Sequence, residues 1–247
     1  MGRHIDRILD ILFPVRCPFC DEIVAGNGKE DAKAERTADR LVCQSCLKML
    51  RFVQDPFCMK CGKALADSAK EYCEDCMERT HFFEQGRSLL VYDDIVRYSI
   101  YRFKYGGRRE YARAYAALTA PRMEAFVRSV SPDLVIPVPL HRKRAARRGY
   151  NQAQLYARHL SRLFGIPCGE HVVKRIKNTR PQKQLDCVSR QNNLKKAFKI
   201  IGNDVKLKTI LLIDDIYTTG STMDALSQEL LSAGAARVCF ITIAGGR

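Results

Sequence analysis

The chain has 247 residues, a formal net charge of +15 and 11 cysteines. This length holds a mid-sized domain with its own apolar core beside a small unit that needs other support. No apolar run approaches the ~18 residues that span a bilayer and no cleavable signal peptide precedes the cysteines, so we expect a cytoplasmic protein without a transmembrane segment. The charge predicts an anionic partner, which includes a nucleic acid, a phosphorylated metabolite or an acidic membrane surface; a generally basic protein is the plainer alternative.

The N-terminal segment carries Ile5, Ile8, Leu9 and Leu12 at helical spacing. This pattern predicts a short amphipathic helix that ends near Pro14 and caps the cysteine-rich part or packs on the larger domain. A membrane-surface anchor is the alternative. Residues 25–40 contain almost no large apolar side chain, which predicts an exposed loop.

Four Cys-x-x-Cys pairs dominate the chain between residues 17 and 76. Two such turns supply the four thiolates of a tetrahedral zinc site, so four pairs predict two closed, structural Zn²⁺ sites. Sequential pairing is the simplest arrangement, a cross-braced one stays open, and disulfides are the alternative to metal. The predicted ligands are Cys17, Cys20, Cys43, Cys46, Cys58, Cys61, Cys73 and Cys76. We assign residues 1–80 to this zinc-bound unit.

Apolar runs alternate with helical patterns in the remainder, residues 81–247. The runs predict strands at 88–92, 134–138, 210–213 and 238–243, and the helical patterns cover 94–104, 110–128, 153–164 and 223–233. Strands that alternate with helices predict an α/β domain with a mostly parallel sheet.

Two adjacent carboxylates follow the apolar run at 210–213, and a turn rich in Thr and Gly opens the next helix. Ligands of parallel sheets bind at this edge, where backbone amides and a helix N-terminus hold a phosphate. The acids suit the hydroxyls of a sugar or Mg²⁺ bridged to further phosphates. The expected ligand is 5-phosphoribosyl-1-pyrophosphate (PRPP) with Mg²⁺; a mere helix cap is the alternative. The predicted residues are Asp214, Asp215, Thr218, Thr219, Gly220, Ser221 and Thr222.

The string LLIDDIYTTGST at 211–222 resembles the PRPP signature of type I phosphoribosyltransferases. With the Cys-x-x-Cys pairs, Phe103-Lys104-Tyr105, PVPLHRKRAARRGYNQA at 137–153 and TRPQKQL at 179–185, the chain resembles the ComF family of competence-associated proteins along nearly its whole length. The resemblance implies a double zinc ribbon joined to a fold of the phosphoribosyltransferase type. It also implies a link to the uptake or use of DNA during natural transformation.

Basic residues outnumber acidic ones thirteen to three between residues 97 and 150. By resemblance, the loop after the strand at 134–138 faces pyrophosphate, whose charge its cations would neutralise. The same cations suit a nucleic-acid backbone, and a solvated charge run is the alternative. The predicted residues are Arg142, Lys143, Arg147, Arg148 and Asn151.

Residues 175–194 form a long polar segment of the kind that closes over a ligand. By resemblance, it corresponds to the flexible loop of phosphoribosyltransferases; a mobile surface loop is the alternative. We expect Arg180, Lys183, Gln184 and Arg190 to reach the ligand.

Two functions follow from these patterns. The preferred one is a DNA-uptake protein of natural transformation that binds PRPP and Mg²⁺, binds single-stranded DNA through its basic loops and zinc unit, and meets proteins of the uptake machinery. The alternative is an active phosphoribosyltransferase that transfers phosphoribosyl to an unidentified base or amine and releases pyrophosphate. No side chain stands out in the sequence as a catalytic base, and no pocket for an acceptor can be identified.

Overall fold

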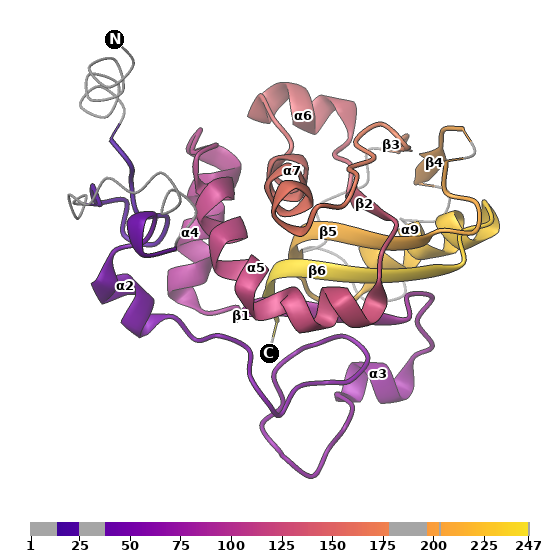
Figure 1. The fold of residues 1–247 in the computed structure, drawn as a ribbon, viewed down its shortest axis with the longest axis horizontal. Coiled ribbons are helices and arrows are strands. Elements are labelled where there is room, and N and C mark those ends of the chain that lie inside the picture. The colour runs from indigo at the N-terminus through magenta and orange to yellow at the C-terminus, as the bar shows by residue number, and fades with distance from the viewer. Residues whose placement is uncertain (1–13, 25–37, 178–196, 203, 247) are drawn as a thin grey trace.

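The computed structural model of the chain describes residues 14–24, 38–177, 197–202 and 204–246 (Figure 1). A parallel sheet lies at its centre, with helices on both faces and the cysteine-rich segments at its periphery. The predicted α/β class with an N-terminal zinc-ribbon-like unit is confirmed. No helix in the described ranges is long and apolar enough to cross a membrane.

The elements follow one another in the alternating order that the sequence predicts. The helices are η2 (Ala38–Arg40), α2 (Gln44–Met49), α3 (Glu74–Glu78), α4 (Asp94–Tyr105), α5 (Tyr111–Val130), α6 (Arg142–Arg148), α7 (Gln152–Phe164) and α9 (Ser221–Ser232). The strands are β1 (Gln85–Val91), β2 (Leu134–Pro137), β3 (Val173–Arg175), β4 (Phe198–Ile200), β5 (Thr209–Tyr217) and β6 (Arg237–Gly245).

The main sheet has the strand order β1-β6-β5-β2, and all of its pairs are parallel. β5 is longer than the apolar run at 210–213 predicts, because it continues to pair with β6 as far as Tyr217. β2 pairs with β5 only as far as Ile213. Asp214 and Asp215 therefore lie where β5 still pairs with β6 but no longer pairs with β2. The side of β5 that faces away from β6 has no neighbouring strand at this point. β3 and β4 form a separate antiparallel pair.

The two faces of the sheet carry separate apolar cores, because successive residues of a strand point to opposite sides. Leu211 and Ile213 of β5 pack with α4, α5 and α7, whereas Ile210 and Leu212 pack with α9 and β4. The first four cysteines join the core on the α4–α5 side. The second four join the core on the α9 side. Each half of the cysteine-rich unit thus packs against a different face of the sheet.

Two expected segments differ from the structure or lie outside it. The predicted basic loop at 142–148 is the helix α6: its Arg, Lys and Ala residues favour helix, His141 caps its N-terminus, and Gly149 ends it with a φ of 77°. The expected N-terminal helix through Leu12 lies outside the described residues, as does most of the expected loop at 25–40. The end of that loop forms η2.

Candidate functional site

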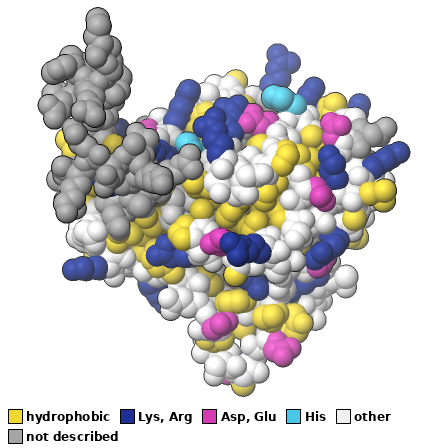
Figure 2. Space-filling model, in the orientation of Figure 1, with side chains coloured by type: hydrophobic (Ala, Val, Ile, Leu, Met, Phe, Trp, Pro, Cys, Tyr) yellow, Lys and Arg dark blue, Asp and Glu magenta, His cyan; other side chains and the backbone are white. Residues whose placement is uncertain are grey.

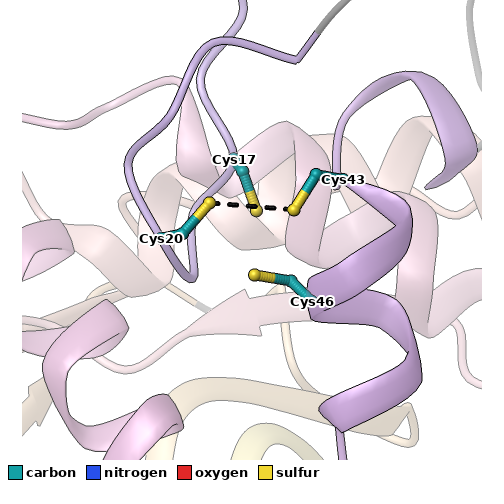
Figure 3. Close-up of side chains that lie close together, drawn as sticks. All are labelled: Cys17, Cys20, Cys43 and Cys46. Carbon is teal, nitrogen blue, oxygen red and sulfur yellow. Dashed lines mark hydrogen bonds between the residues drawn. The ribbon is translucent and has the colours of Figure 1, made fainter.

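The first cysteine cluster consists of Cys17, Cys20, Cys43 and Cys46. Figure 3 shows the four sulfur atoms pointing toward one another, two from the loop before residue 21 and two from the start of α2. All ligand atoms lie within 4.8 Å of one another, and the Sγ atoms of Cys20 and Cys43 are 3.7 Å apart. Tetrahedral zinc with Zn–S bonds of ~2.3 Å requires sulfurs about 3.8 Å apart. The cluster therefore fits one zinc ion.

The second cluster consists of Cys58, Cys61, Cys73 and Cys76, with the Sγ atoms of Cys61 and Cys73 also 3.7 Å apart. Cys58 and Cys61 are fully buried. Sequential pairing is thus confirmed and the cross-braced alternative is excluded. Both sets are closed, which suits a structural metal.

The turn of the second cluster lies directly on the start of β1. Gly62 has a φ of 69°, and a Cβ atom at this position would lie 2.5 Å from the carbonyl oxygen of Gly86. The backbone N–H of Gly86 in turn donates to Lys60 O at 2.8 Å. Phe83, Tyr217 and Phe240 share an apolar core with the cluster. The second cluster is therefore packed against the strands that hold the candidate ligand site.

The expected phosphate turn, residues 218–222, joins the end of β5 to α9. Gly220 has a φ of 78° and is the residue before the first turn of α9. A Cβ there would lie 2.7 Å from the hydroxyl of Tyr217 and 3.1 Å from His81 Cε1. Protein neighbours and the positive φ thus account for this glycine, rather than the close approach of a ligand. Thr219 Oγ1 and Ser221 Oγ lie 3.0 Å apart at the turn.

A cavity of about 400 Å³ opens at the carboxyl edge of the sheet, and we call it the sheet-edge cavity. Of the residues expected from the sequence, its lining contains Asp214, Asp215, Thr218, Thr222, Arg147, Arg148 and Asn151. Arg142, Lys143, Thr219, Gly220 and Ser221 do not line it. Arg180, Lys183, Gln184 and Arg190 lie outside the described residues.

Sequence reasoning missed several residues of this lining. Lys104, Tyr105, Arg144 and Arg175 all face the cavity. Lys104 and Tyr105 belong to the Phe-Lys-Tyr string at 103–105, to which the sequence assigns no role, whereas Arg144 lies in the basic run that is expected to face pyrophosphate. Arg175 ends β3, at the start of the polar segment.

The acid pair experiences two different environments. Asp215 is buried and lies 2.9 Å from Lys104 Nζ. Asp214 Oδ1 accepts the backbone N–H of Asp215 at 2.8 Å. Burial, together with the charge of Asp215, raises the pKa of Asp214 to about 7. One carboxylate therefore has a cation beside it, and the other has a pKa near neutral.

The cations of the cavity are partly engaged by protein. Arg148 donates to Gln152 Oε1 at 3.0 Å and to the hydroxyl of Tyr105 at 2.9 Å. Burial, and then repulsion by Arg144, lowers the pKa of Arg175 to about 10. Asn151 caps α7 through Ala153 N and donates to Val138 O at 3.0 Å, so its side chain holds the backbone at the cavity wall.

Comparison with known proteins supports both units. Residues 8–77 match the double zinc ribbon domain and residues 145–247 match the phosphoribosyl transferase domain. The chain is 33% identical to Competence protein F of Haemophilus influenzae, over 78% of this chain and 85% of that protein. It is 29% identical to Competence protein ComFC of Bacillus subtilis, over 89% and 90%, and 30% identical to DNA utilization protein YhgH of Salmonella typhimurium, over 80% and 87%. The zinc ribbon match and the two Cys₄ clusters support zinc as their metal.

Proposed function

We propose that this chain, which belongs to the ComF family, handles DNA during natural transformation and carries a working site for PRPP with Mg²⁺. The names of the relatives described above refer to competence or DNA utilization. The observation that supports the ligand site is the sheet-edge cavity, which is lined by the acid pair, by Thr218 and Thr222 of the phosphate turn, and by several cations. We divide the work between residues 1–80, as the zinc-bound unit, and residues 81–247, as the ligand-binding unit.

The proposed pose follows from the chemistry of the lining. Backbone amides of residues 218–222 and the N-terminus of α9 hold the 5′-phosphate, since both present N–H groups to an anion. Asp214 and Asp215 accept the ribose hydroxyls or bind Mg²⁺ together with phosphate oxygens. Arg144, Arg147 and Lys104 face the same space and neutralise the pyrophosphate.

Magnesium fits this site only together with the ligand. Among the described residues, Asp214 and Asp215 are the acidic side chains that line the cavity, and Lys104 already pairs with one of them. Two carboxylates are too few for an all-protein Mg²⁺ site but suit an ion that is also bound by phosphate oxygens. We therefore expect Mg²⁺ alone to bind weakly and PRPP to increase its affinity.

Isothermal titration calorimetry with PRPP and Mg²⁺ tests the site. The unmodified chain should bind, and Asp214→Ala with Asp215→Ala should abolish binding. Asp204→Ala, which changes an exposed acid outside the cavity, is the matched control and should bind normally. Absence of binding by the unmodified chain would end the proposal.

Binding of single-stranded DNA is the second part of the proposed function. Lys and Arg side chains gather along the top of the molecule in Figure 2, where Figure 1 places α6. This helix carries five cations in seven residues, with Arg142 and Lys143 outside the sheet-edge cavity. Cations that replace counterions on a strand make its affinity depend on salt.

A salt titration tests the DNA footprint. Replacing Arg142, Lys143, Arg147 and Arg148 with Ala removes four cations. Because each phosphate contact contributes ~0.7 to the steepness of log affinity against log salt, this steepness should fall by about 3. Lys206→Ala with Lys208→Ala is the control, because these residues precede β5 at the opposite edge of the sheet. An unchanged slope in the fourfold variant would place the DNA elsewhere.

An active phosphoribosyltransferase is the second candidate, favoured by the open space beside the acid pair. A nucleophile would form a bond to ribose C1 while the C1–oxygen bond breaks and pyrophosphate leaves with the bonding electrons. The chain would contribute positioning and cations for the leaving group. A screen for pyrophosphate release with bases and amines decides between the candidates: release that requires an acceptor supports the enzyme.

We also propose that the protein works in the cytoplasm and meets proteins of the DNA-uptake machinery there. All cysteines of the described ranges are free thiols, and eight of them gather in two metal-binding clusters. Thiols persist in a reducing compartment, which supports this location.

A further inference from the structure

Helix α4 presents three exposed tyrosines on one face. The exposed fractions of Tyr98, Tyr101 and Tyr105 are 57%, 62% and 49%. Residues three and four apart share a face of a helix, so the three side chains form a row that we call the tyrosine stripe. The opposite face of α4 is buried through residues that include Ile100 and Phe103. Packing of the core therefore does not explain the stripe.

The rings of the stripe already contact guanidinium groups and one another. Arg97 lies over the ring of Tyr98 at 5.1 Å, and Arg148 of α6 lies over Tyr105 at 4.7 Å. The ring centroids of Tyr101 and Tyr105 are 5.0 Å apart. Arginine beside an exposed aromatic face is the combination that stacks a base and contacts its phosphate.

The helix beneath the stripe is firmly held. Arg102 donates to the carbonyl oxygens of Pro18 and Phe19, which lie within the first Cys-x-x-Cys turn, at 3.2 and 2.7 Å. Asp93 caps the N-terminus of α4 through Val96 N at 3.0 Å. The first zinc cluster thereby fixes the orientation of α4, and the tyrosines form a pre-organised surface.

The stripe leads from the surface into the sheet-edge cavity. Tyr105 lines that cavity, and Arg148 connects it to α6. Asp94, at the other end of α4, is paired with Arg97 at 3.2 Å. Positive charge therefore increases along the stripe toward α6, in the direction that a polyanion would follow.

We propose that the tyrosine stripe stacks successive bases of single-stranded DNA and leads the strand toward α6. The proposal rests on the DNA binding proposed above and assigns the surface of the protein that contacts the bases. The ring centroids of Tyr101 and Tyr105 lie 5.0 Å apart, which is wider than the ~3.4 Å rise per base of a duplex strand. Paired bases have no free faces to offer, so the stripe selects an unpaired strand. The flanking cations favour this polyanion over a protein partner.

Fluorescence anisotropy with a labelled oligothymidylate tests the proposal. Tyr98→Ala with Tyr101→Ala should weaken binding roughly 10- to 100-fold with an unchanged salt slope, because no charge is removed. Tyr98→Phe with Tyr101→Phe should retain affinity, since the ring faces remain. Leu207→Ala is the matched control: this apolar side chain is 88% exposed and lies near the start of β5. PRPP binding should survive in the alanine variant, since neither residue lines the cavity.

An abasic strand of equal length supplies a measurement that needs no variant. The unmodified chain should bind this strand as weakly as the alanine variant binds oligothymidylate. Equal affinity of the unmodified chain for both strands, or a phenylalanine variant as weak as the alanine one, overturns the stacking proposal and leaves DNA binding intact. Failure of the unmodified chain to bind any strand ends the DNA part of the proposed function as well. Alanine variants that keep DNA affinity but lose a partner protein would reassign the stripe.

Discussion

Lys104 Nζ lies 2.9 Å from Asp215 Oδ2 at the wall of the sheet-edge cavity, and both side chains are mostly withdrawn from solvent. This ion pair gives the two adjacent acids different surroundings. Asp215 has a cation beside it, whereas Asp214 faces desolvation and the charge of its neighbour, which together raise its pKa. This arrangement and the packing of the zinc clusters lead to five predictions.

Replacing Lys104 with Met should weaken PRPP binding about 10- to 100-fold. The change removes a cation from the cavity and leaves Asp215 beside Asp214 without its counter-charge, which should also destabilise the fold by about 1–3 kcal/mol. Calorimetry and thermal unfolding measure the two effects. Lys104→Arg keeps the charge and should lose less affinity; an equal loss in both variants would contradict the role of charge.

Asp214→Asn should stabilise the chain by about 1–2 kcal/mol, or a few degrees in Tm, while abolishing PRPP binding. The folded-state pKa of Asp214 is about 7, above its ordinary value of 3.8. The stability that this group contributes is therefore full below pH 4 and is lost as the pH rises toward 7. The uncharged side chain in Asp214→Asn avoids this loss of stability. The variant should therefore be more stable than the unmodified chain at pH 8 and equally stable near pH 4. Thermal unfolding at both pH values measures it.

PRPP binding with Mg²⁺ should strengthen as the pH rises from 6 to 8. Asp214 is protonated below its pKa of about 7 and cannot then serve as an anionic ligand of a metal ion. Above that pH the carboxylate is available, and the bound cation offsets the cost of its charge. Calorimetry across this range should give a midpoint near 7, and a flat profile would remove Asp214 from the metal-binding step.

Chelation of zinc should loosen the phosphate turn as well as the cysteine-rich unit. The second cluster shares an apolar core with Tyr217, the residue just before the turn, and Gly62 contacts the backbone of β1. Hydrogen–deuterium exchange should therefore rise at the start of α9 in Cys58→Ser. Cys17→Ser belongs to the other face of the sheet and should instead raise exchange in α4. Identical exchange patterns in the two variants would contradict this separation.

The contact between His81 and Asp224 offers a smaller perturbation of the same link. His81 Nδ1 lies 2.7 Å from Asp224 Oδ2, and Phe82 N donates to the other oxygen at 3.0 Å. His81→Ala leaves that carboxylate with one bond fewer and should destabilise the chain by about 1–3 kcal/mol. Exposed His171 provides the control substitution, His171→Ala, which should leave Tm within a degree or two.

The sequence predicted those features whose signal is local. Each Cys-x-x-Cys pair brings its own two thiols together, and the apolar runs of β5 and β6 mark buried strands wherever they lie in the fold. The contact between Lys104 and Asp215 is different, because α4 and β5 are far apart in the chain and only the folded sheet brings them together. The exposure of Tyr98 could not be predicted from the sequence either, because helical spacing alone does not tell which face of the helix the core covers.

The prediction of a basic loop at 142–148 is wrong, because the same residues also favour a helix. Seven residues that favour helix, a capping histidine and a following glycine were all present in the printed sequence. Gly220 is a different case: the turn was expected, but the neighbours that require glycine there are His81, which comes far earlier in the chain, and Tyr217 of β5. Such tertiary neighbours leave no trace in the local pattern.

The close approach of Gly62 to Gly86 bears on how this protein can be dissected. A fragment that starts after residue 80 would keep Phe83, Tyr217 and Phe240 but lose the buried Cys58 and Cys61 that share their core. Such a fragment would expose an apolar aromatic surface on the α9 side of the sheet and would tend to aggregate. The second cysteine cluster therefore completes the core of the α/β domain, and we expect the two units to be soluble when they are expressed as one chain.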